Sequence, residues 1–278
     1  MDHVDLGLKD ANVVVIGASR GIGRAAARQF AAEGARVALL ARNEKGLEKT
    51  AGQCREAGSP DVLTFAADMS STEEVTAAVD AIGKAWGTIN VLINNAANSI
   101  GTHGTFEAVN DENVYIEAFN RITLGYARST RAALPYMKAA DWGRIVNISA
   151  VSTSSAMPML HIYNMCKAAL NYMSKSNAKE FAPFGISVNL LSPGGIMVDG
   201  GNWGEVMNRY FEEAGLDRTN PFHAVELNKI KFGGEGCWMG RHGLIDEYGS
   251  TIVFMGSKAN SYMTGADVNV DGGGNFHS

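Results

Sequence analysis

Two side chains that could move a proton, Tyr163 and Lys167, lie four residues apart in the segment YNMCK. In a helix this spacing places both side chains on one face. A lysine ammonium beside a phenol favours the phenolate, so it lowers the pKa of the tyrosine. A tyrosine tuned in this way can pass a proton to or from a substrate oxygen. The same spacing occurs by chance in many helices, so its meaning depends on the rest of the chain.

A glycine-rich loop, GASRGIG, runs from Gly17 to Gly23, upstream of this pair. It follows a short apolar run and precedes an alanine-rich stretch, as a loop between a strand and a helix would. Gly17 permits a tight turn, Gly21 lets the backbone approach a pyrophosphate, and the helix N-terminus favours the negative charge. The glycine spacing differs from the commoner dinucleotide fingerprint, and a plain glycine turn is the alternative. Together with the tyrosine–lysine pair, the loop predicts hydride transfer with a tyrosine as acid–base.

The residues that follow the second expected strand bear on the choice of cofactor. An acidic residue about twenty positions past the loop would bind an adenosine ribose hydroxyl, but this chain has Ala41, Arg42 and Asn43 there. A further arginine, Arg20, lies within the loop. Two guanidinium groups without an acid suit a 2′-phosphate, which they can hold by charge-assisted hydrogen bonds. We therefore expect NADP(H) rather than NAD(H); two solvated arginines are the alternative.

The elements that must position these residues alternate between strands and helices. The expected strands span residues 13–16, 36–40, 62–66, 89–93, 144–148, 186–191 and 267–271. The expected helices span residues 24–33, 44–57, 71–86, 111–137, 162–181 and 246–255, the third opened by a capping box of Ser71 and Glu74. Strict alternation predicts an α/β fold, a Rossmann-type doubly wound parallel sheet in a single domain of residues 1–278.

The stretch of residues 199–241 interrupts this alternation. It carries many large apolar side chains, namely Trp203, Met207, Tyr210, Phe211, Phe222, Phe232, Trp238 and Met239. A long aromatic insert after a sheet strand is often a substrate lid. A pair of helices that contacts another subunit is the alternative, and both can hold. The apolar character of the insert suggests a bulky apolar substrate.

The composition and charge argue against several classes of protein. The chain has 278 residues, of which 46% are hydrophobic, and a formal net charge of −5. Lys and Arg are scattered, so we expect no binding of nucleic acid or of an anionic membrane. Three distant cysteines, Cys54, Cys166 and Cys237, fit a reduced cytoplasmic protein better than a disulfide framework. No Cys/His spacing resembles a metal site, so we expect no metal.

Taken in order, the motifs resemble the short-chain dehydrogenase/reductase family in its single-domain form, similar to the 3-oxoacyl reductases. The resemblance covers roughly residues 8–273. The motifs in chain order are the glycine loop, Asp68, NNAA from Asn94, the tyrosine–lysine pair, Pro193-Gly194, YMTG from Tyr262 and VDGG from Val270. Each motif is weak alone, but their order and spacing together are very specific. The family resemblance also implies a homo-oligomer, a tetramer or a dimer.

The resemblance implies a role for each matching residue. Tyr163 would be the acid–base, and Lys167 would hold the nicotinamide ribose hydroxyls and lower the tyrosine pKa. Asn95 would line the ribose and steady the centre of the sheet, and the backbone of residues 193–196 would face the nicotinamide. The full set of expected cofactor-binding residues is Gly17, Ser19, Arg20, Gly21, Ile22, Gly23, Arg42, Asn43, Asp68, Met69, Asn95, Ala96, Ala97, Tyr163, Lys167, Pro193, Gly194 and Ile196. Of these, Asp68 and Met69 would contact the adenine.

Three positions depart from the family pattern. The family usually has a serine thirteen residues before the tyrosine, but this chain has Ala150 there. Ser149 and Ser152 flank it, and we expect Ser152 to substitute as a catalytic residue because residues two apart on an extended segment share a face. Val198 stands where a threonine often contacts the carboxamide.

The third departure concerns a proton-relay water. The family usually holds this water with an asparagine, where this chain has Ile122, which cannot hold it. Asn120 is two residues away, which on a helix is far around the axis.

We therefore expect an NADP(H)-dependent oxidoreductase that interconverts a ketone and a secondary alcohol on a fairly bulky apolar substrate, with Tyr163 as acid–base. The departures leave two alternatives open. One is the reduction of a conjugated C=C bond, since charge would then develop on an enolate. The other is a catalytically weak or non-catalytic NADP(H)-binding protein.

Overall fold

The computed structural model of the chain describes residues 5–96, 102–154, 157–196, 202–232 and 237–274. Within these residues, the centre is a parallel sheet of seven strands in the order β3-β2-β1-β4-β5-β6-β7. The strands are β1 (Asn12–Ile16), β2 (Arg36–Ala41), β3 (Val62–Ala66), β4 (Val91–Asn94), β5 (Gly143–Ile148), β6 (Ile186–Pro193) and β7 (Asp267–Val270). This confirms the predicted single-domain, Rossmann-type fold. The strand order reverses between β1 and β4, and sheets of this kind usually bind their ligands beside such a reversal.

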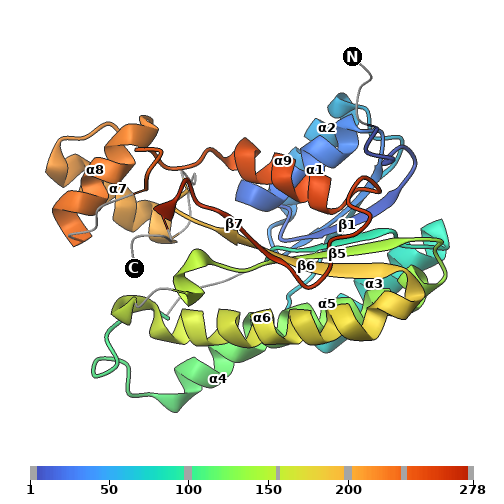
Figure 1. Cartoon of the computed structure of the whole chain (residues 1–278), viewed down its shortest axis with the longest axis horizontal. Coiled ribbons are helices and arrows are strands. Elements are labelled where there is room, and N and C mark those ends of the chain that lie inside the picture. Colours follow the sequence, from blue (N-terminus) through green and yellow to red (C-terminus); the bar gives the residue numbers. More distant parts are fainter. Residues whose placement is uncertain (1–4, 97–101, 155–156, 197–201, 233–236, 275–278) are drawn as a thin grey trace.

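Helices cover both faces of the sheet (Figure 1). The α-helices of the described residues are α1 (Gly21–Ala32), α2 (Glu44–Ala57), α3 (Thr72–Trp86), α4 (Glu112–Arg121), α5 (Thr123–Lys138), α6 (His161–Phe181), α7 (Asn202–Ala214), α8 (Pro221–Phe232) and α9 (Ile245–Met255). Side chains of α1, α2 and α9 form the core on one face, and those of α3, α5 and α6 form the core on the other.

The side chains of β1 alternate between these two cores. Val13 and Val15 join the core beneath α1, α2 and α9, whereas Val14 and Ile16 join the core beneath α3, α5 and α6. Successive side chains of a strand point to opposite faces, so a strand covered on both faces must be apolar throughout. The unbroken apolar run in the sequence follows from this. Each large side chain buried in this way, such as Phe30 of α1, contributes about 1.5–3 kcal/mol.

Local signals set the bounds of several helices. The side chain of Asn43 caps α2 by accepting a backbone hydrogen bond, and Gly58 ends this helix in the left-handed conformation. Ser71 caps α3 by accepting the Glu74 N–H at 3.2 Å, as predicted. The Glu74 carboxylate, however, accepts the backbone N–H of Asp68, while the Ser71 N–H donates to the Asp68 carbonyl. Of the two hydrogen bonds of the predicted capping box, only the one from the Glu74 N–H to the Ser71 hydroxyl therefore forms.

The prediction of one long helix over residues 111–137 is wrong. The chain forms two helices, α4 and α5, which break at Ile122, where φ is −93° and ψ is −70°. The buried Ile122 side chain packs against Cys166 of α6, and the Thr123 hydroxyl donates to the Cys166 carbonyl at 2.9 Å. We attribute the break to these tertiary contacts, which the continuous apolar periodicity of the sequence does not reveal.

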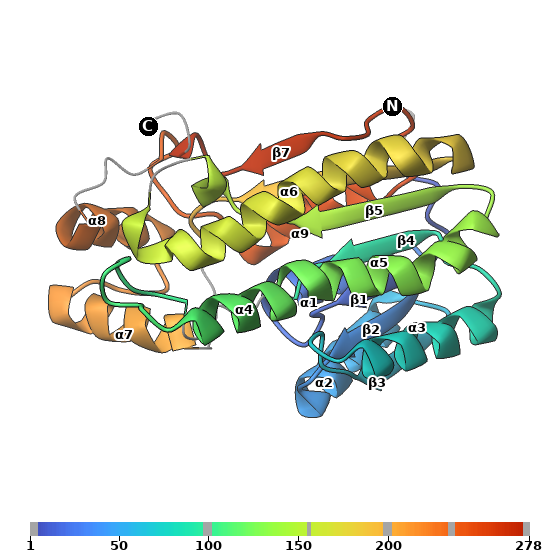
Figure 2. The ribbon, with the colours of Figure 1, turned by 90° about the horizontal axis from the view of Figure 1, so that it is seen from below.

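The insert of residues 199–241 forms two helices, α7 and α8, in its described part. Both lie beyond the edge of the sheet where the strands end, toward which the arrowheads of β4, β5 and β7 point in Figure 2. The start of α6 lies at this carboxyl edge as well (Figures 1 and 2). Phe211, Ala224 and Leu227 form a small core between the two insert helices. Among the described residues, no helix is long and apolar enough to cross a membrane.

Candidate active site

The glycine loop has the conformation that its sequence predicts. Gly17 has a φ of 79° and Gly21 a φ of 57°, in the left-handed region that glycine tolerates. A Cβ on Gly23 would lie 2.3 Å from the Gly17 carbonyl oxygen and 2.6 Å from Asn95 Nδ2. Only glycine therefore lets α1 begin so close to β1 and β4. The first turn of α1 directs its N–H groups toward the carboxyl edge of the sheet, where a phosphate group could bind.

Arg24 supports this loop from behind, a role that the sequence did not suggest. Its Nε donates to the Thr50 hydroxyl of α2 at 3.0 Å, and its guanidinium also donates to the Ser19 carbonyl. Thr50 in turn donates to the Ala18 carbonyl at 2.9 Å. The partner of Arg24 lies 26 residues away in the sequence, so local spacing could not identify the contact.

Arg42 and Asn43 lie just past the end of β2, as expected, and the carboxylate of Asp68 lies close to Arg42. The Arg42 guanidinium, on a side chain that is 58% exposed, contacts the Asp68 carboxylate at 3.4 Å. The two positions that follow β2 contain no acid, as predicted, but Asp68, which follows β3, lies close to Arg42. Partial burial raises the pKa of Asp68, but hydrogen bonds from Ser70 and the nearby Arg42 outweigh it and hold this pKa below its usual value. Arg20 is exposed at the N-cap position of α1.

The two asparagines at the end of β4, Asn94 and Asn95, have different hydrogen-bond partners. Asn94 is fully buried, donates to Asn147 Oδ1 of β5 at 2.9 Å and accepts the Ser129 hydroxyl of α5 at 2.6 Å. Asn95 Nδ2 donates to the Gly17 carbonyl at 3.1 Å. Asn94, rather than the predicted Asn95, therefore steadies the centre of the sheet, and Asn95 ties the end of β4 to the glycine loop.

Other expected cofactor residues occupy the same edge of the sheet. Ala96 lies against the backbone of Gly17, and Ile22 packs on the core beneath α1. Met69 is buried. Two further positions, Ala97 and Val198, lie outside the described residues.

Helix α6 carries Tyr163 and Lys167 one turn apart, as their spacing predicts. The Lys167 Nζ lies 5.6 Å from the centre of the Tyr163 ring. Lys167 is fully buried, and its Nζ donates to the Ile148 carbonyl at 2.6 Å and to the Tyr126 hydroxyl at 3.3 Å. Tyr163 is partly buried and packs against the small apolar cluster that includes Ile122.

Burial controls the ionisation of this pair more strongly than their mutual interaction does. Burial raises the pKa of Tyr163 to about 12, with a smaller contribution from Cys166. Burial lowers the pKa of Lys167 to about 7, and Cys166 opposes this shift. The prediction that the pKa of Tyr163 is lowered is therefore wrong, because removal from water disfavours the charged form of each group.

Ser152 lies near the site, but it does not lie on the extended segment that the prediction requires. Ala150 is extended, but residues 151–153 form a short 3-10 helix, so the alternation of an extended strand does not apply. The Ser152 hydroxyl is buried and donates to Asn164 Oδ1 at 2.6 Å. Asn164 follows Tyr163 on α6, so this bond holds Ser152 close to the start of that helix.

Ser149 belongs to a different polar network. Its hydroxyl donates to Asn171 Oδ1 of α6 at 2.5 Å, and Asn171 Nδ2 donates to the Asp267 carboxylate at 3.3 Å. The Ser192 hydroxyl donates to the same carboxylate at 2.6 Å. This network joins the ends of β5 and β6 to β7, so Ser149 has a structural role.

The position expected to hold a relay water is apolar, as predicted. Ile122 is fully buried beside Ile162 and Cys166. Asn120 does not replace it, because its side chain and its backbone carbonyl both accept hydrogen bonds from Arg128.

The residues that follow β6 are bonded to β7 and to Gly243, which lies just after the insert. The Gly194 N–H donates to the Val270 carbonyl, and Ile196 pairs with Gly243 in an isolated parallel bridge. Pro193 is the last residue of β6. This arrangement holds the expected nicotinamide-facing backbone from two sides.

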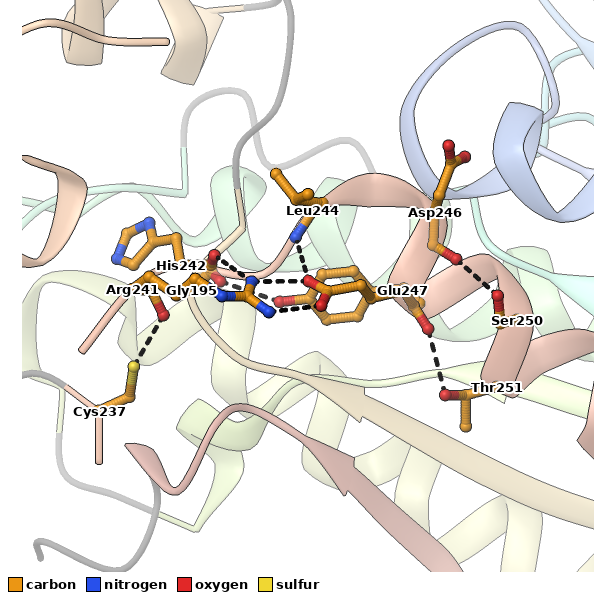
Figure 3. Close-up of polar contacts among 10 residues, drawn as sticks. Gly195, Cys237, Arg241, His242, Leu244, Asp246, Glu247, Ser250 and Thr251 are labelled. Atoms are coloured by element: carbon orange, nitrogen blue, oxygen red, sulfur yellow. Dashed lines mark hydrogen bonds and ion pairs between the residues drawn. The ribbon is translucent and has the colours of Figure 1, made fainter. Parts of the chain in front are cut away.

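An ion pair fixes the segment that bears this bridge (Figure 3). The Arg241 guanidinium forms two bonds, at 2.8 and 2.5 Å, to the Glu247 carboxylate of α9. The bond from Arg241 and a backbone bond from Leu244 lower the pKa of Glu247 to about 2. The Tyr248 hydroxyl donates to the Gly195 carbonyl at 2.9 Å. These contacts hold residues 241–244, at the base of the insert, between α9 and the end of β6.

One polar contact lies at the start of α6. The Tyr115 hydroxyl lies 3.0 Å from His161 Nε2, and Phe106 packs near the same imidazole ring. His161 precedes Tyr163 by two residues. Among the described residues, no group of three or more His, Cys, Asp or Glu side chains could hold a metal ion.

Sequence comparisons connect this geometry to known proteins. A family model described as short chain dehydrogenase matches residues 11–202. The 11-beta-hydroxysteroid dehydrogenase A of Sesamum indicum is 37% identical over 182 residues, which are 66% of this chain and 51% of that protein. The chain thus spans about half the length of this relative. The 3-oxoacyl-[acyl-carrier-protein] reductase FabG of Haemophilus influenzae is 30% identical over 260 residues, 94% of this chain and 96% of that protein.

Solved structures match nearly the whole chain. L-Sorbose reductase from Gluconobacter frateurii, complexed with NADPH and L-sorbose, has a TM-score of 0.86 and 28% identity, covering 98% of both chains. An NAD⁺-bound xylitol dehydrogenase has a TM-score of 0.82 and 26% identity, covering 96% of this chain and 99% of the other. Proteins with this fold therefore bind either form of the nicotinamide cofactor.

Proposed function

The chain belongs to the short-chain dehydrogenase family, and from that premise we propose that it interconverts a ketone and a secondary alcohol. The observation that carries the proposal is the position of Tyr163 and Lys167 on one turn of α6, at the edge of the sheet where the glycine loop opens α1. When bound there, a reduced nicotinamide cofactor supplies the hydride.

Tyr163 acts as the acid in the direction of ketone reduction. Its raised pKa, about 12, keeps the phenol protonated at neutral pH, so a proton is available when charge develops on the carbonyl oxygen. Lys167 in its charged form stabilises the phenolate that remains. Ser152, held by Asn164, is the candidate to donate a hydrogen bond to the substrate oxygen.

We further propose a preference for NADP(H) over NAD(H). Arg42 supports it, because its exposed guanidinium can form a charge-assisted bond with a 2′-phosphate. Asp68 shares that guanidinium, and for this reason we expect a preference rather than exclusion of NAD(H). L-Sorbose reductase, a structural relative, contains NADPH.

The substrate we propose is fairly bulky and apolar, with the insert as its lid. The insert exposes the large apolar side chains of Phe222, Trp238 and Met239, and Met157 and Met159 are exposed just before α6. A second candidate is a ketose or the corresponding polyol, which the likeness to L-sorbose reductase over 98% of both chains favours.

The experiment that tests this function is an assay of Tyr163→Phe against a panel of apolar cyclic ketones, ketoses and one enone, with NADPH. We expect turnover of at least one ketone by the wild type and a loss of roughly 10²–10⁴-fold in the variant. Tyr172→Phe is the matched control, since Tyr172 is a 79% exposed tyrosine of the same helix. Unchanged turnover in Tyr163→Phe would refute the role of the tyrosine.

The same panel separates the alternatives. A saturated ketone as the product from the enone would favour C=C reduction, whereas an allylic alcohol would favour carbonyl reduction. Tight NADPH binding without turnover of any compound would favour a non-catalytic NADP(H)-binding protein.

The proposal also covers the oligomeric state of the protein and its compartment. We propose a cytoplasmic homo-oligomer, a tetramer or a dimer. Leu124 of α5 and Met165 of α6 are apolar side chains that are 40% and 58% exposed, and contact with another subunit would bury such side chains. Gel filtration at the mass of a monomer would contradict an oligomer.

A further inference from the structure

A second buried tyrosine, Tyr126 of α5, contacts the lysine of the site. Its hydroxyl accepts a hydrogen bond from Lys167 Nζ at 3.3 Å and donates one to the Ile148 carbonyl at 3.2 Å. Lys167 Nζ donates to the same carbonyl at 2.6 Å. All three polar atoms therefore contact one another, and both side chains are 0% exposed.

The surroundings of Lys167 offer little else to stabilise its charge. On its own helix, Tyr163 and Cys166 face it, and both have raised pKa values because of burial, so both are neutral at neutral pH. From β5 only the Ile148 carbonyl reaches it, and from α5 only the Tyr126 hydroxyl. Among the described residues, no carboxylate forms an ion pair with Lys167.

Apolar side chains pack near the helix break that precedes Tyr126. Ile122 lies one helical turn before Tyr126 and packs in an apolar cluster with Cys166. Burial raises the pKa of Cys166 and outweighs the opposing effect of Arg121. A buried ammonium without polar partners loses its proton, because desolvation disfavours the charged form. The Tyr126 hydroxyl is thus the polar side chain on α5 that opposes this loss.

We propose that Tyr126 is a positioning residue for Lys167: its hydroxyl oxygen orients the buried ammonium toward Tyr163 and keeps it charged, where Ile122 provides no polar group. This inference rests on the proposed function, in which the charge of Lys167 supports the phenolate of Tyr163. Because the single Tyr126 proton is directed to the Ile148 carbonyl, a lone pair of the hydroxyl oxygen faces the ammonium. Tyr126 acts through Lys167 and does not itself exchange a proton with the substrate.

The proposal predicts the direction of a measurable shift. Replacing Tyr126 with Phe removes an oxygen that interacts more strongly with the ammonium than with the neutral amine. A hydrogen bond to a charged group is worth a shift of about one to two pKa units. The pKa of Lys167, about 7 in the wild type, should therefore fall by about one unit or more in Tyr126→Phe.

The test follows Lys167 through a reporter on its neighbour and needs no substrate. Full-length protein carrying 3-fluorotyrosine at position 163 is titrated by ¹⁹F NMR from about pH 5 to about pH 9. A step in the fluorine shift that disappears in Lys167→Met belongs to Lys167. We expect this step to move to lower pH in Tyr126→Phe and to stay in place in Tyr136→Phe. Tyr136 lies on the same helix but donates to Asp80 instead, so it is the matched control.

Two outcomes would overturn the inference. One is a Lys167 step at the same pH in folded Tyr126→Phe as in the wild type, and the other is no such step in either protein. If Tyr126→Phe does not fold, Tyr126→Met is used, because the flexible Met side chain adapts to irregular space and also lacks the hydroxyl.

A failure of this inference can be told apart from a failure of the proposed function. The fluorine titration reports the charge of Lys167 whether or not the protein turns over a ketone, whereas the proposed function fails if Tyr163→Phe keeps wild-type turnover. A moved step together with a turnover in Tyr126→Phe that falls at least about fivefold near pH 7, as a fall of one unit from a pKa of about 7 requires, would support both.

Discussion

At the scale of single residues, one physical effect acts in opposite directions on the two central groups. Burial raises the pKa of Tyr163 to about 12 and lowers that of Lys167 to about 7. Both shifts favour the neutral form, because a low-dielectric site disfavours charge. The tyrosine therefore stays a proton donor at neutral pH, while the lysine is close to its midpoint. Small polar contacts, such as that of Tyr126, then decide how much positive charge the site holds.

The buried lysine should reduce the stability of the folded protein. Its pKa in the folded protein, about 7, lies below the ordinary lysine value of 10.5, so the unfolded chain binds more protons between these two pH values and stability rises with pH there. Lys167→Met should thus be more stable than the wild type by on the order of a few kcal/mol below about pH 7. This advantage should shrink toward zero as the pH approaches about 10.5.

Urea unfolding of the cofactor-free proteins at several pH values measures this difference. Lys175→Met is the control, because Lys175 is exposed on the same helix, and substitutions at the surface usually change stability by less than about 0.5 kcal/mol. A Lys167→Met variant that is less stable than the wild type near pH 6 would contradict the prediction.

At the scale of elements, the start of α1 depends on close contacts with β1 and β4. Gly23 has no space for a Cβ, and Asn95 bonds to the Gly17 carbonyl. Arg24 and Thr50 fasten the same loop to α2. These contacts place the N–H groups of the first helical turn at one site, so that a phosphate could be bound without reorganisation of the loop.

Gly23→Ala should displace this loop. The added Cβ would lie 2.3 Å from the Gly17 carbonyl oxygen, and overpacking of this kind typically costs about 1–3 kcal/mol. We expect a lower midpoint in urea and weaker NADPH binding, measured by quenching of intrinsic fluorescence.

Gly52→Ala provides the matched control in the neighbouring helix. A Cβ on Gly52 would meet nothing within 4 Å, and alanine is favoured over glycine inside a helix by roughly 0.5–1 kcal/mol. This variant should be at least as stable as the wild type and bind NADPH equally well. Equal behaviour of the two variants would show that the loop tolerates a side chain.

At the scale of the whole molecule, the groups proposed for binding and chemistry collect at the carboxyl edge of the sheet. The glycine loop, the ends of β2 and β4, the start of α6 and the base of the insert all lie there (Figures 1 and 2). Parallel sheets place their sites at this edge, beside the reversal of strand order. The two cores on either face of the sheet and the hydrogen bond between Asn94 and Asn147 support the strands that end at this edge.

The choice between NADP(H) and NAD(H) can be tested on the stability of the whole protein. A ligand at 100 times its Kd stabilises the folded state by about 2.7 kcal/mol, so the tighter cofactor should raise Tm more at equal concentration. We expect the larger shift from NADPH, and a loss of this difference in Arg42→Ala.

Arg55→Ala is the control for a general change of charge, because Arg55 is exposed in the last turn of α2. It should keep the larger shift with NADPH. An equal or larger shift with NADH in the wild type would contradict the proposed preference.

Local signals along the chain sufficed to predict the order of the elements and most of their bounds to within one residue. Helix α2 and strand β3 have the predicted limits, because capping by Asn43 and a left-handed Gly58 act within a few residues of the chain. The conformations of Gly17 and Gly21 and the spacing of Tyr163 and Lys167 are likewise local properties. The alternation of strands and helices predicted the fold, and the order and spacing of all the motifs carried the family resemblance.

The pKa values of the site residues and the hydrogen-bond partners of their side chains depend on the folded arrangement instead. Contacts between segments far apart in the sequence accompany the features that the sequence did not predict. These features are the break at Ile122, the contact of Arg42 with Asp68, the 3-10 helix at Ser152 and the bond of Tyr126 to Lys167. The pKa of Tyr163 rises rather than falls because of burial, which depends on every element packed around it. Spacing along the chain fixes which side chains share a helix face, but desolvation is a property of the assembled surroundings.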